Sequence, residues 1–194
     1  AAEKIAPELD PRRLRLWLGV ILTLTAWLIL RGGAAGDRPP PPDKGTYMFT
    51  EKNENGLIYM TSDRIGTRHA FTTRHGGVSP APFDSLNLAS NRGDREENIL
   101  ENYRRLGAAV GFDASRAVGC RQIHSDLVRV AREEDAGKIR WDERPYDADA
   151  LITNVPNLPL FAYGSDCCVI TLYDPTSRSI GAVHAGWRGT AAGI

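Results

Sequence analysis

The sequence predicts an α+β fold built from layered mixed β-sheets with flanking helices. Two observations carry this prediction: short apolar runs with strand character recur from residue 57 onward, and the clearest helical spacing is confined to one segment between them. Many strands with few helices between them favour an α+β arrangement over a doubly wound parallel sheet. Of the 194 residues, 42% are hydrophobic and 25% are charged, as is usual for a globular protein.

Turn-forming residues separate the strand-like runs. A loop rich in glycine, proline and serine follows the second run, from Arg74 to Asn91. Residues 174–177 (DPTS) form a turn between the last two runs, which we expect to pair as a hairpin. The expected strands are residues 57–61, 69–73, 117–124, 127–131, 150–153, 158–163, 168–173 and 179–184.

The predicted helix begins near Asp94 and ends before Gly111. Asp94 and Glu97 have the three-residue spacing of a capping box, in which two side chains satisfy free amides at a helix start. The apolar residues that follow have helical spacing and predict one buried face: Ile99, Tyr103, Leu106 and Val110.

Residues 1–47 differ in composition from the rest of the chain. Residues 16–30 form an uncharged apolar run, about 22 Å long as a helix, which is typical of a membrane anchor or an export signal, with a buried helix as the alternative. Four prolines at 39–42 predict a linker. We expect the catalytic domain to span residues 48–194, with residues 1–47 as a segment that is either native or foreign to it.

Charge and cysteine content restrict the function. Lys plus Arg equals Asp plus Glu at 24 each, so no basic surface for nucleic acid is predicted. The cysteines are Cys120, Cys167 and Cys168, and an odd number with one adjacent pair is a poor framework for disulfides. A reducing, cytoplasmic location is therefore expected. Membrane anchoring or export through residues 16–30 is the alternative.

Two histidines and a cysteine occupy the ends of predicted strands. His124 and His184 each close a strand and Cys167 begins another, and the handover from strand to loop is where sites are commonly built. Alternation along a strand places Cys167 and Cys168 on opposite faces, so only one thiol should reach a given site. Two His and one Cys with an open fourth position match the ligand pattern of catalytic zinc. One bound metal ion is therefore one interpretation of these residues.

Two other chemistries use the same side chains. Two His and a Cys are also the equatorial ligands of a blue-copper centre, but that site usually has an axial Met, and Met48 and Met60 lie far upstream. Alternatively, Cys167 is a thiolate nucleophile with a histidine as its base and Asp166 as the orienting group. That interpretation needs no metal but leaves the second histidine without a role.

Two loops have residues suited to binding an anion. Residues 186–190 (GWRGT) lead into a helix that we expect to start at Thr190, and Arg188 offers a planar donor group for phosphate or carboxylate. The second loop, RHGGVS, contributes Arg74 together with the Ser79 hydroxyl and backbone amides. Glycine-rich loops more often form simple turns, so neither loop defines a site alone.

Six motifs occur in a fixed order from about Gly56 to the end of the chain: TTRHGGVSPAPFDSLNLA (72–89), ENYRRL (101–106), RQIH (121–124), DALIT (149–153), GSDCCVITLYD (164–174) and AVHAGWRG (182–189). Together they resemble the YfiH/laccase-domain family, whose members are described as polyphenol oxidases and as purine nucleoside phosphorylases. The combination of HAGWRG with an upstream QxH and a DC pair is specific to that family. The resemblance implies an α+β fold with layered mixed sheets.

The resemblance also implies roles for individual residues. The zinc ligands of the family correspond to His124, Cys167 and His184, which leaves Cys168 as a core residue. The residues expected to bind substrate are Arg74, Ser79 and Asn87. From the chemistry of the side chains, and not from the resemblance, Asp166 is expected to move a proton and Arg74 and Arg188 to hold phosphate, so these three are the residues expected to take part in catalysis.

The activity implied by the resemblance is zinc-dependent phosphorolysis of adenosine, inosine, guanosine and methylthioadenosine, with deamination of adenosine. Purine nucleosides and phosphate are the expected partners. Members of the family continue beyond HAGWRG with another helix and further strands, so we expect this chain to lack the C-terminal part of the domain. The alternatives are a copper-dependent polyphenol oxidase, a metal-free cysteine hydrolase and an inactive fragment.

Overall fold

The computed structural model describes residues 49–194. The expectations for the apolar run, the proline linker and the start of the domain at residue 48 fall outside these residues. Among the helices of the described part, none has the length and apolar character needed to cross a membrane.

The first sheet is a three-stranded antiparallel one, with β1 (Phe49–Glu54), β2 (Leu57–Ser62) and β3 (Phe71–Thr72) in that order. Residues Leu57 and Tyr59 of β2 are buried and face the helix behind the sheet. The sequence did not predict β1, because all six of its residues are exposed and it lacks the apolar alternation of a half-buried strand.

The helix α2 (Glu96–Val110) packs against this sheet and confirms the predicted helix. Ile99, Tyr103 and Leu106 are buried, as the spacing predicts. The predicted capping box is wrong, because Arg95 occupies the N-cap position. The Asp94 carboxylate instead accepts hydrogen bonds from the Arg95 amide at 2.8 Å and the Asn98 side chain at 3.0 Å.

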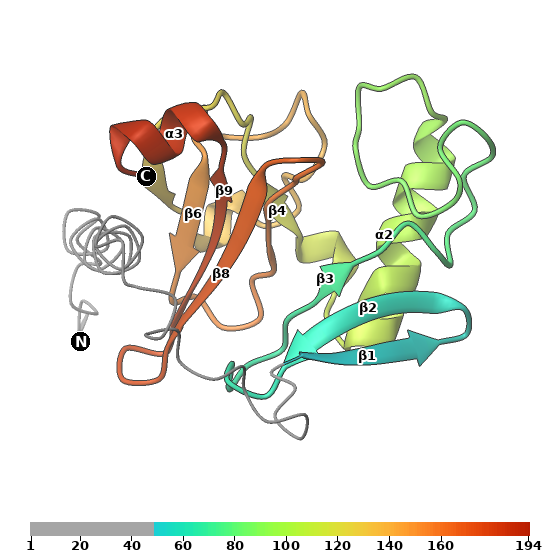
Figure 1. The fold of residues 1–194 in the computed structure, drawn as a ribbon, viewed down its shortest axis with the longest axis horizontal. Coiled ribbons are helices and arrows are strands. Elements are labelled where there is room, and N and C mark those ends of the chain that lie inside the picture. The colour runs from blue at the N-terminus through green and yellow to red at the C-terminus, as the bar shows by residue number, and fades with distance from the viewer. Residues whose placement is uncertain (1–48) are drawn as a thin grey trace, which may run out of the picture.

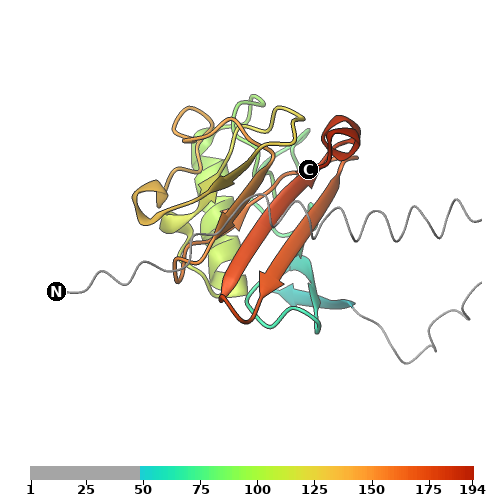
Figure 2. The ribbon, with the colours of Figure 1, turned by 90° about the vertical axis from the view of Figure 1, so that its left-hand side faces the viewer.

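The second sheet is mixed and holds the order β5 (Val128–Val130), β6 (Ala150–Thr153), β9 (Ser179–Ala185) and β8 (Cys168–Asp174). The β5–β6 pair is parallel and the other two pairs are antiparallel, so the predicted mixed sheet and the predicted hairpin β8–β9 are confirmed. A short helix, α3 (Trp187–Ala192), follows β9 at the end of the sheet (Figure 1). The hairpin and α2 lie on different sides of the molecule (Figures 1 and 2).

A short parallel pair, β4 (Val118–Gly119) with β7 (Leu160–Phe161), forms a third sheet. The strand predicted over 117–124 is therefore wrong beyond Gly119. Gln122 explains the difference, because its side-chain amide donates to the Tyr163 carbonyl and accepts from the Tyr163 amide, both at 2.7 Å. The side chain of Gln122 thus makes the hydrogen bonds that a paired strand would make through its backbone, and the backbone turns away from the sheet toward His124. Two 3₁₀ turns, η1 (Ala114–Arg116) and η2 (Glu133–Asp135), complete the described elements.

Candidate metal centre

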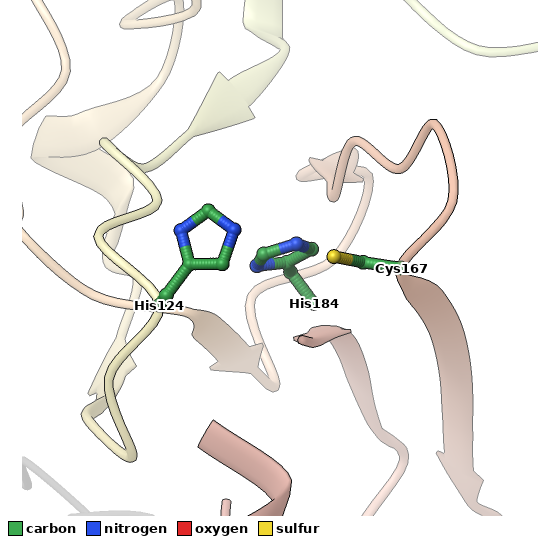
Figure 3. A group of neighbouring side chains, drawn as sticks. All are labelled: His124, Cys167 and His184. Atoms are coloured by element: carbon green, nitrogen blue, oxygen red, sulfur yellow. The ribbon is translucent and has the colours of Figure 1, made fainter. Parts of the chain in front are cut away.

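Three of the predicted site residues come together. One ligand atom each from His124, Cys167 and His184 lies within 4.8 Å of the others. The three side chains come from the loop after β4, the loop before β8 and the strand β9, and they point toward one another (Figure 3). Segments separated by up to 60 positions thus supply one compact set of donors.

The pairing of β8 with β9 places two of these residues. His184 is opposite Val169 and Ala185 is opposite Cys168, so Cys167 lies just beyond the paired end of β8, level with the loop that follows β9. His184 is buried and Cys167 is half-buried. Cys168 is exposed, so the expectation that it is a core residue is wrong. It is the first residue of β8, which is an edge strand of its sheet.

His124 is in a turn and not at the end of a strand. Its φ of 60° is in the left-handed region, which residues with a side chain seldom adopt. Its backbone amide donates to Asp149 Oδ1 at 3.0 Å, and the next amide, of Ser125, donates to Asp149 Oδ2 at 2.6 Å. His124 therefore does not follow the alternation of a strand, and the turn sets the direction of its side chain.

Asp149 is a residue of the candidate site that the sequence patterns did not indicate. It is fully buried directly before β6, and its Oδ1 lies 2.8 Å from His184 Nδ1. Burial raises the pKa of this carboxyl, but the hydrogen bonds from His184 and Ser125 outweigh that effect and hold the pKa below its usual value. The available signal was an aspartate directly before the four apolar or small residues ALIT, because a carboxylate entering a buried strand needs several donors.

The backbone at Gly186 leaves the space in which these donors converge. A Cβ built on Gly186 would lie 2.9 Å from His124 Cδ2, 3.3 Å from Cys167 Sγ and 3.4 Å from His184 Cε1. Because Asp149 occupies Nδ1 of His184, Nε2 is the nitrogen left to bind an ion. Two imidazoles and a thiolate around such a space fit a zinc or copper ion.

The Cys167 thiol is not set up as an activated nucleophile. Burial raises its pKa, and the neighbouring Asp166 carboxylate raises it further. Reactive cysteines have a lowered pKa, which positive neighbours or a helix N-terminus provide. The Cys167 environment is the opposite, which favours a ligand over a nucleophile.

A cavity of about 1420 Å³ borders the three ligands and extends between the two larger sheets. Of the other predicted site residues, Arg74, Asn87 and Asp166 line it, whereas Ser79 and Arg188 do not. The cavity is large enough for a nucleoside-sized ligand.

The three residues predicted to bind substrate, Arg74, Ser79 and Asn87, are each hydrogen-bonded to a protein group. Residues 74–87, which carry them, are called the predicted substrate loop. Arg74 donates from Nε to the Asp84 carbonyl and from Nη2 to the Asp84 carboxylate, both at 2.6 Å. Ser79 is buried and accepts from Asn102 of α2 at 2.9 Å. Asn87 donates to the Asp94 carboxylate at 3.0 Å. Ser79 thus supports the loop from inside, and Arg74 and Asn87 face the cavity.

Arg188 lies outside the cavity because α3 starts earlier than predicted. The helix begins at Trp187 instead of Thr190, which places Arg188 in its first turn. There its guanidinium lies 5.2 Å from the centre of the Trp187 ring. Trp187 is 72% exposed, so this pair is on the surface beside the ligands.

The fold and the three converging side chains define an α+β protein with a candidate metal site, of the kind that the motifs suggest. Residues 68–194 match the family described as multi-copper polyphenol oxidoreductase laccase. The chain belongs to this family, and the resemblance found in its motifs is confirmed.

Relatives and solved structures agree with this assignment. A purine nucleoside phosphorylase of Deinococcus radiodurans is 38% identical over 72% of this chain and 51% of its own length. The purine nucleoside phosphorylase YlmD of Geobacillus stearothermophilus is 35% identical over 66% of this chain and 48% of its own length. The chain thus spans about half the length of these relatives.

Two crystal structures share the fold. That of YlmD from Geobacillus stearothermophilus has a TM-score of 0.70 at 30% identity, covering 77% of this chain and 56% of that protein. That of the Bacillus licheniformis hypothetical protein YfiH has a TM-score of 0.66 at 28% identity over the same shares. The predicted α+β class is therefore confirmed.

Proposed function

We propose that this chain carries the metal centre and part of the substrate cavity of a zinc-dependent purine nucleoside phosphorylase. The observation that carries the proposal is the convergence of His124, Cys167 and His184 around Gly186, at the border of the large cavity. Relatives at 35–38% identity bear that enzyme name, which supports a nucleoside and phosphate as substrates. Adenosine, inosine, guanosine and methylthioadenosine are the proposed nucleosides.

In phosphorolysis, phosphate replaces the purine at the sugar: the bond from C1′ to the base nitrogen breaks, and a bond from C1′ to a phosphate oxygen forms. A bound metal supplies a Lewis acid that polarises an oxygen. Arg74 has its Nη1 group left to meet an anion, since Nε and Nη2 are held by Asp84. Asp166 is exposed to the cavity beside Cys167 and is the proposed group for moving a proton.

Deamination of adenosine is a second activity that we propose for the same centre. It differs from phosphorolysis in its reactants and products, because water supplies an oxygen to C6, the bond from C6 to the amino nitrogen breaks with release of ammonia, and the bond to the sugar stays intact. Inosine is then the product, and phosphate is not consumed. The proposal rests on the three candidate ligands, because two histidines and one cysteine leave a fourth position at which zinc can activate water.

Copper-dependent oxidation of phenols is the competing function, because the description of the matched family names it. The phosphorylase and the phenol oxidase predict different metals in the purified protein. Elemental analysis that finds one zinc per chain supports the phosphorylase, whereas one or more copper ions with a visible absorption band support the oxidase.

The experiment that tests the proposed function is a product assay with matched cysteine variants. Adenosine is incubated with the zinc-loaded protein, with and without phosphate, and the products are separated. Adenine with ribose 1-phosphate, formed only when phosphate is present, is the expected result. Cys167→Ala should abolish both zinc binding and turnover, whereas the exposed neighbour Cys168→Ala should retain both. Equal activity of the two variants contradicts the metal centre.

A further inference from the structure

One buried carboxylate contacts two of the three candidate ligands. Asp149 Oδ1 lies 2.8 Å from Nδ1 of His184 and accepts from the amide of His124 at 3.0 Å. Asp149 Oδ2 accepts from the amide of Ser125 at 2.6 Å and from its hydroxyl at 2.7 Å. The backbone of the same residue is involved as well, because the His184 amide donates to the Asp149 carbonyl at 2.7 Å.

This arrangement satisfies both oxygens of the carboxylate inside the protein. A buried charge is costly unless it is paired and hydrogen-bonded, and Asp149 is fully buried. Its contacts are charge-assisted and therefore among the stronger hydrogen bonds of a protein. The side chain has one orientation in which all of them form, so the groups that it holds are fixed relative to one another.

The contact with His184 selects one form of its imidazole. An acceptor at 2.8 Å from Nδ1 favours the proton on that nitrogen, which leaves the lone pair of Nε2 free. Nε2 is adjacent to the Cε1 atom that borders the space at Gly186. The carboxylate thus directs the binding nitrogen of a buried ring toward the other ligands.

The contact with the turn acts on His124. This residue has a φ of 60°, a conformation that a side-chain-bearing residue holds only when its surroundings impose it. The amides on both sides of the left-handed residue, those of Ile123 at 3.3 Å and Ser125 at 2.6 Å, donate to the same Asp149 oxygen. Three successive amides are therefore gathered on one carboxylate, and the turn cannot open without losing them.

We propose that Asp149 is a positioning residue that sets the two histidines of the metal centre at once, one through its ring nitrogen and the other through the turn that carries it. The proposal rests on the metal site of the proposed function. A residue directly before β6, which is itself no candidate ligand, thus holds together two candidate ligands from separate segments.

Asp149→Asn is the sharpest test, because an amide cannot reproduce both faces of the carboxylate. With its oxygen toward His184, the Asn NH₂ would face the donors of Ser125; with its oxygen toward Ser125, the NH₂ would face the protonated Nδ1 of His184. Either orientation should release one histidine. Ser125→Ala is the matched control, since it removes one hydrogen bond of Asp149 and leaves the backbone amides and His184 in place.

Zinc affinity is measured by competition with a chromophoric chelator, and ligand geometry by the visible spectrum of the cobalt-substituted protein. We expect Asp149→Asn to bind zinc about 10- to 100-fold more weakly and to shift the cobalt bands, as outer groups of metal sites typically do. Ser125→Ala should stay within about threefold of wild type. Wild-type affinity and an unchanged cobalt spectrum in Asp149→Asn would overturn the positioning role.

A measurement on the wild type keeps the proposal testable if the variant does not fold. In the metal-free protein, ¹⁵N chemical shifts of neutral His184 should show the proton on Nδ1, and a proton on Nε2 overturns the proposal. The proposed function has a separate point of failure. A wild-type chain that binds no metal overturns the metal centre itself, whereas a wild type that binds zinc beside an unaffected Asp149→Asn overturns only the role of Asp149.

Discussion

Replacing Gly186 with alanine should destroy metal binding while leaving the fold intact. The added methyl carbon would lie 2.9 Å from His124 Cδ2, whereas non-bonded carbons rest at about 3.5 Å or more. The His124 ring must therefore retreat by about 0.6 Å. Distances in a metal site tolerate about 0.2 Å, so the movement breaks the geometry of the site. Cys167 Sγ at 3.3 Å and His184 Cε1 at 3.4 Å restrict any escape of the methyl group to the other side.

The expected loss of affinity is at least about 100-fold. Structural zinc sites with four ligands bind with about 10–16 kcal/mol, or roughly 3 kcal/mol for each ligand. Losing one of three protein ligands thus costs about two orders of magnitude in affinity, at 1.36 kcal/mol for each factor of ten. The metal-free protein should lose less than about 1 kcal/mol of its free energy of unfolding, since Gly186 has a φ of −69° and alanine is only a poorer N-cap.

Isothermal titration with zinc and urea unfolding of the metal-free protein measure the two quantities. Gly181→Ala, on the strand β9 that ends just before Gly186, is the control, because its Cβ would meet Leu172 and Ile152 side chains at 3.3–3.4 Å and none of the three ligands. It should bind zinc like the wild type. Zinc binding by Gly186→Ala at wild-type strength refutes the reasoning, and so does a loss of affinity that is matched by an equal loss of stability.

Two further predictions concern the support of the substrate loop. Asn102→Ala should lower the free energy of unfolding by about 2–4 kcal/mol in urea titrations, because this buried amide makes four hydrogen bonds to the loop. The control Asn98→Ala on the same helix should lower it by less than about 1 kcal/mol. Equal losses in the two variants contradict the prediction. Burial opposes ionisation of Asp94, but hydrogen bonds from Ser79, Asn98, Asn87 and the Arg95 amide outweigh it and lower its pKa from 3.8 to about 2. A pKa that is lower in the folded than in the unfolded chain stabilises the fold at pH values above the unfolded pKa, and this stability is lost as the pH falls from about 4 to 2. Asp94→Asn should therefore be about 1 kcal/mol less stable than wild type at pH 6 and equal to it near pH 2. A constant difference across that range contradicts the assignment.

Secondary structure was predictable where one periodicity dominated. Helix α2 has four apolar residues at helical spacing, three of them buried, and the hairpin β8–β9 has a four-residue turn between two apolar runs. The strand expected over 117–124 failed, because the side chain of Gln122 pairs with the backbone of Tyr163, a contact between residues 41 positions apart. Local patterns carry no information about such a contact.

The candidate metal ligands were predictable, whereas their surroundings were not. His124, Cys167 and His184 are rare residue types that the sequence patterns placed at the borders of strands, and the motif resemblance joined them into one site. The left-handed turn at His124 and its anchor Asp149 depend on the approach of β6, which no local pattern encodes. The exposure of Cys168 likewise depends on what packs against that end of β8, which no local pattern encodes.

The candidate metal centre and the predicted substrate loop are held by separate polar networks. Asp149, directly before β6, contacts both histidines, whereas Asn102 of α2 holds the loop that carries Arg74 and Asn87. No hydrogen bond between described residues links the side chains of Asp149 and Asn102, and the cavity lies between the elements that carry them. Perturbations at sites without shared partners are usually additive. Substitution of Asn102 should therefore weaken substrate binding and leave the metal affinity unchanged. Substitution of Asp149 should weaken the metal affinity and leave the binding of substrate to the metal-free protein unchanged.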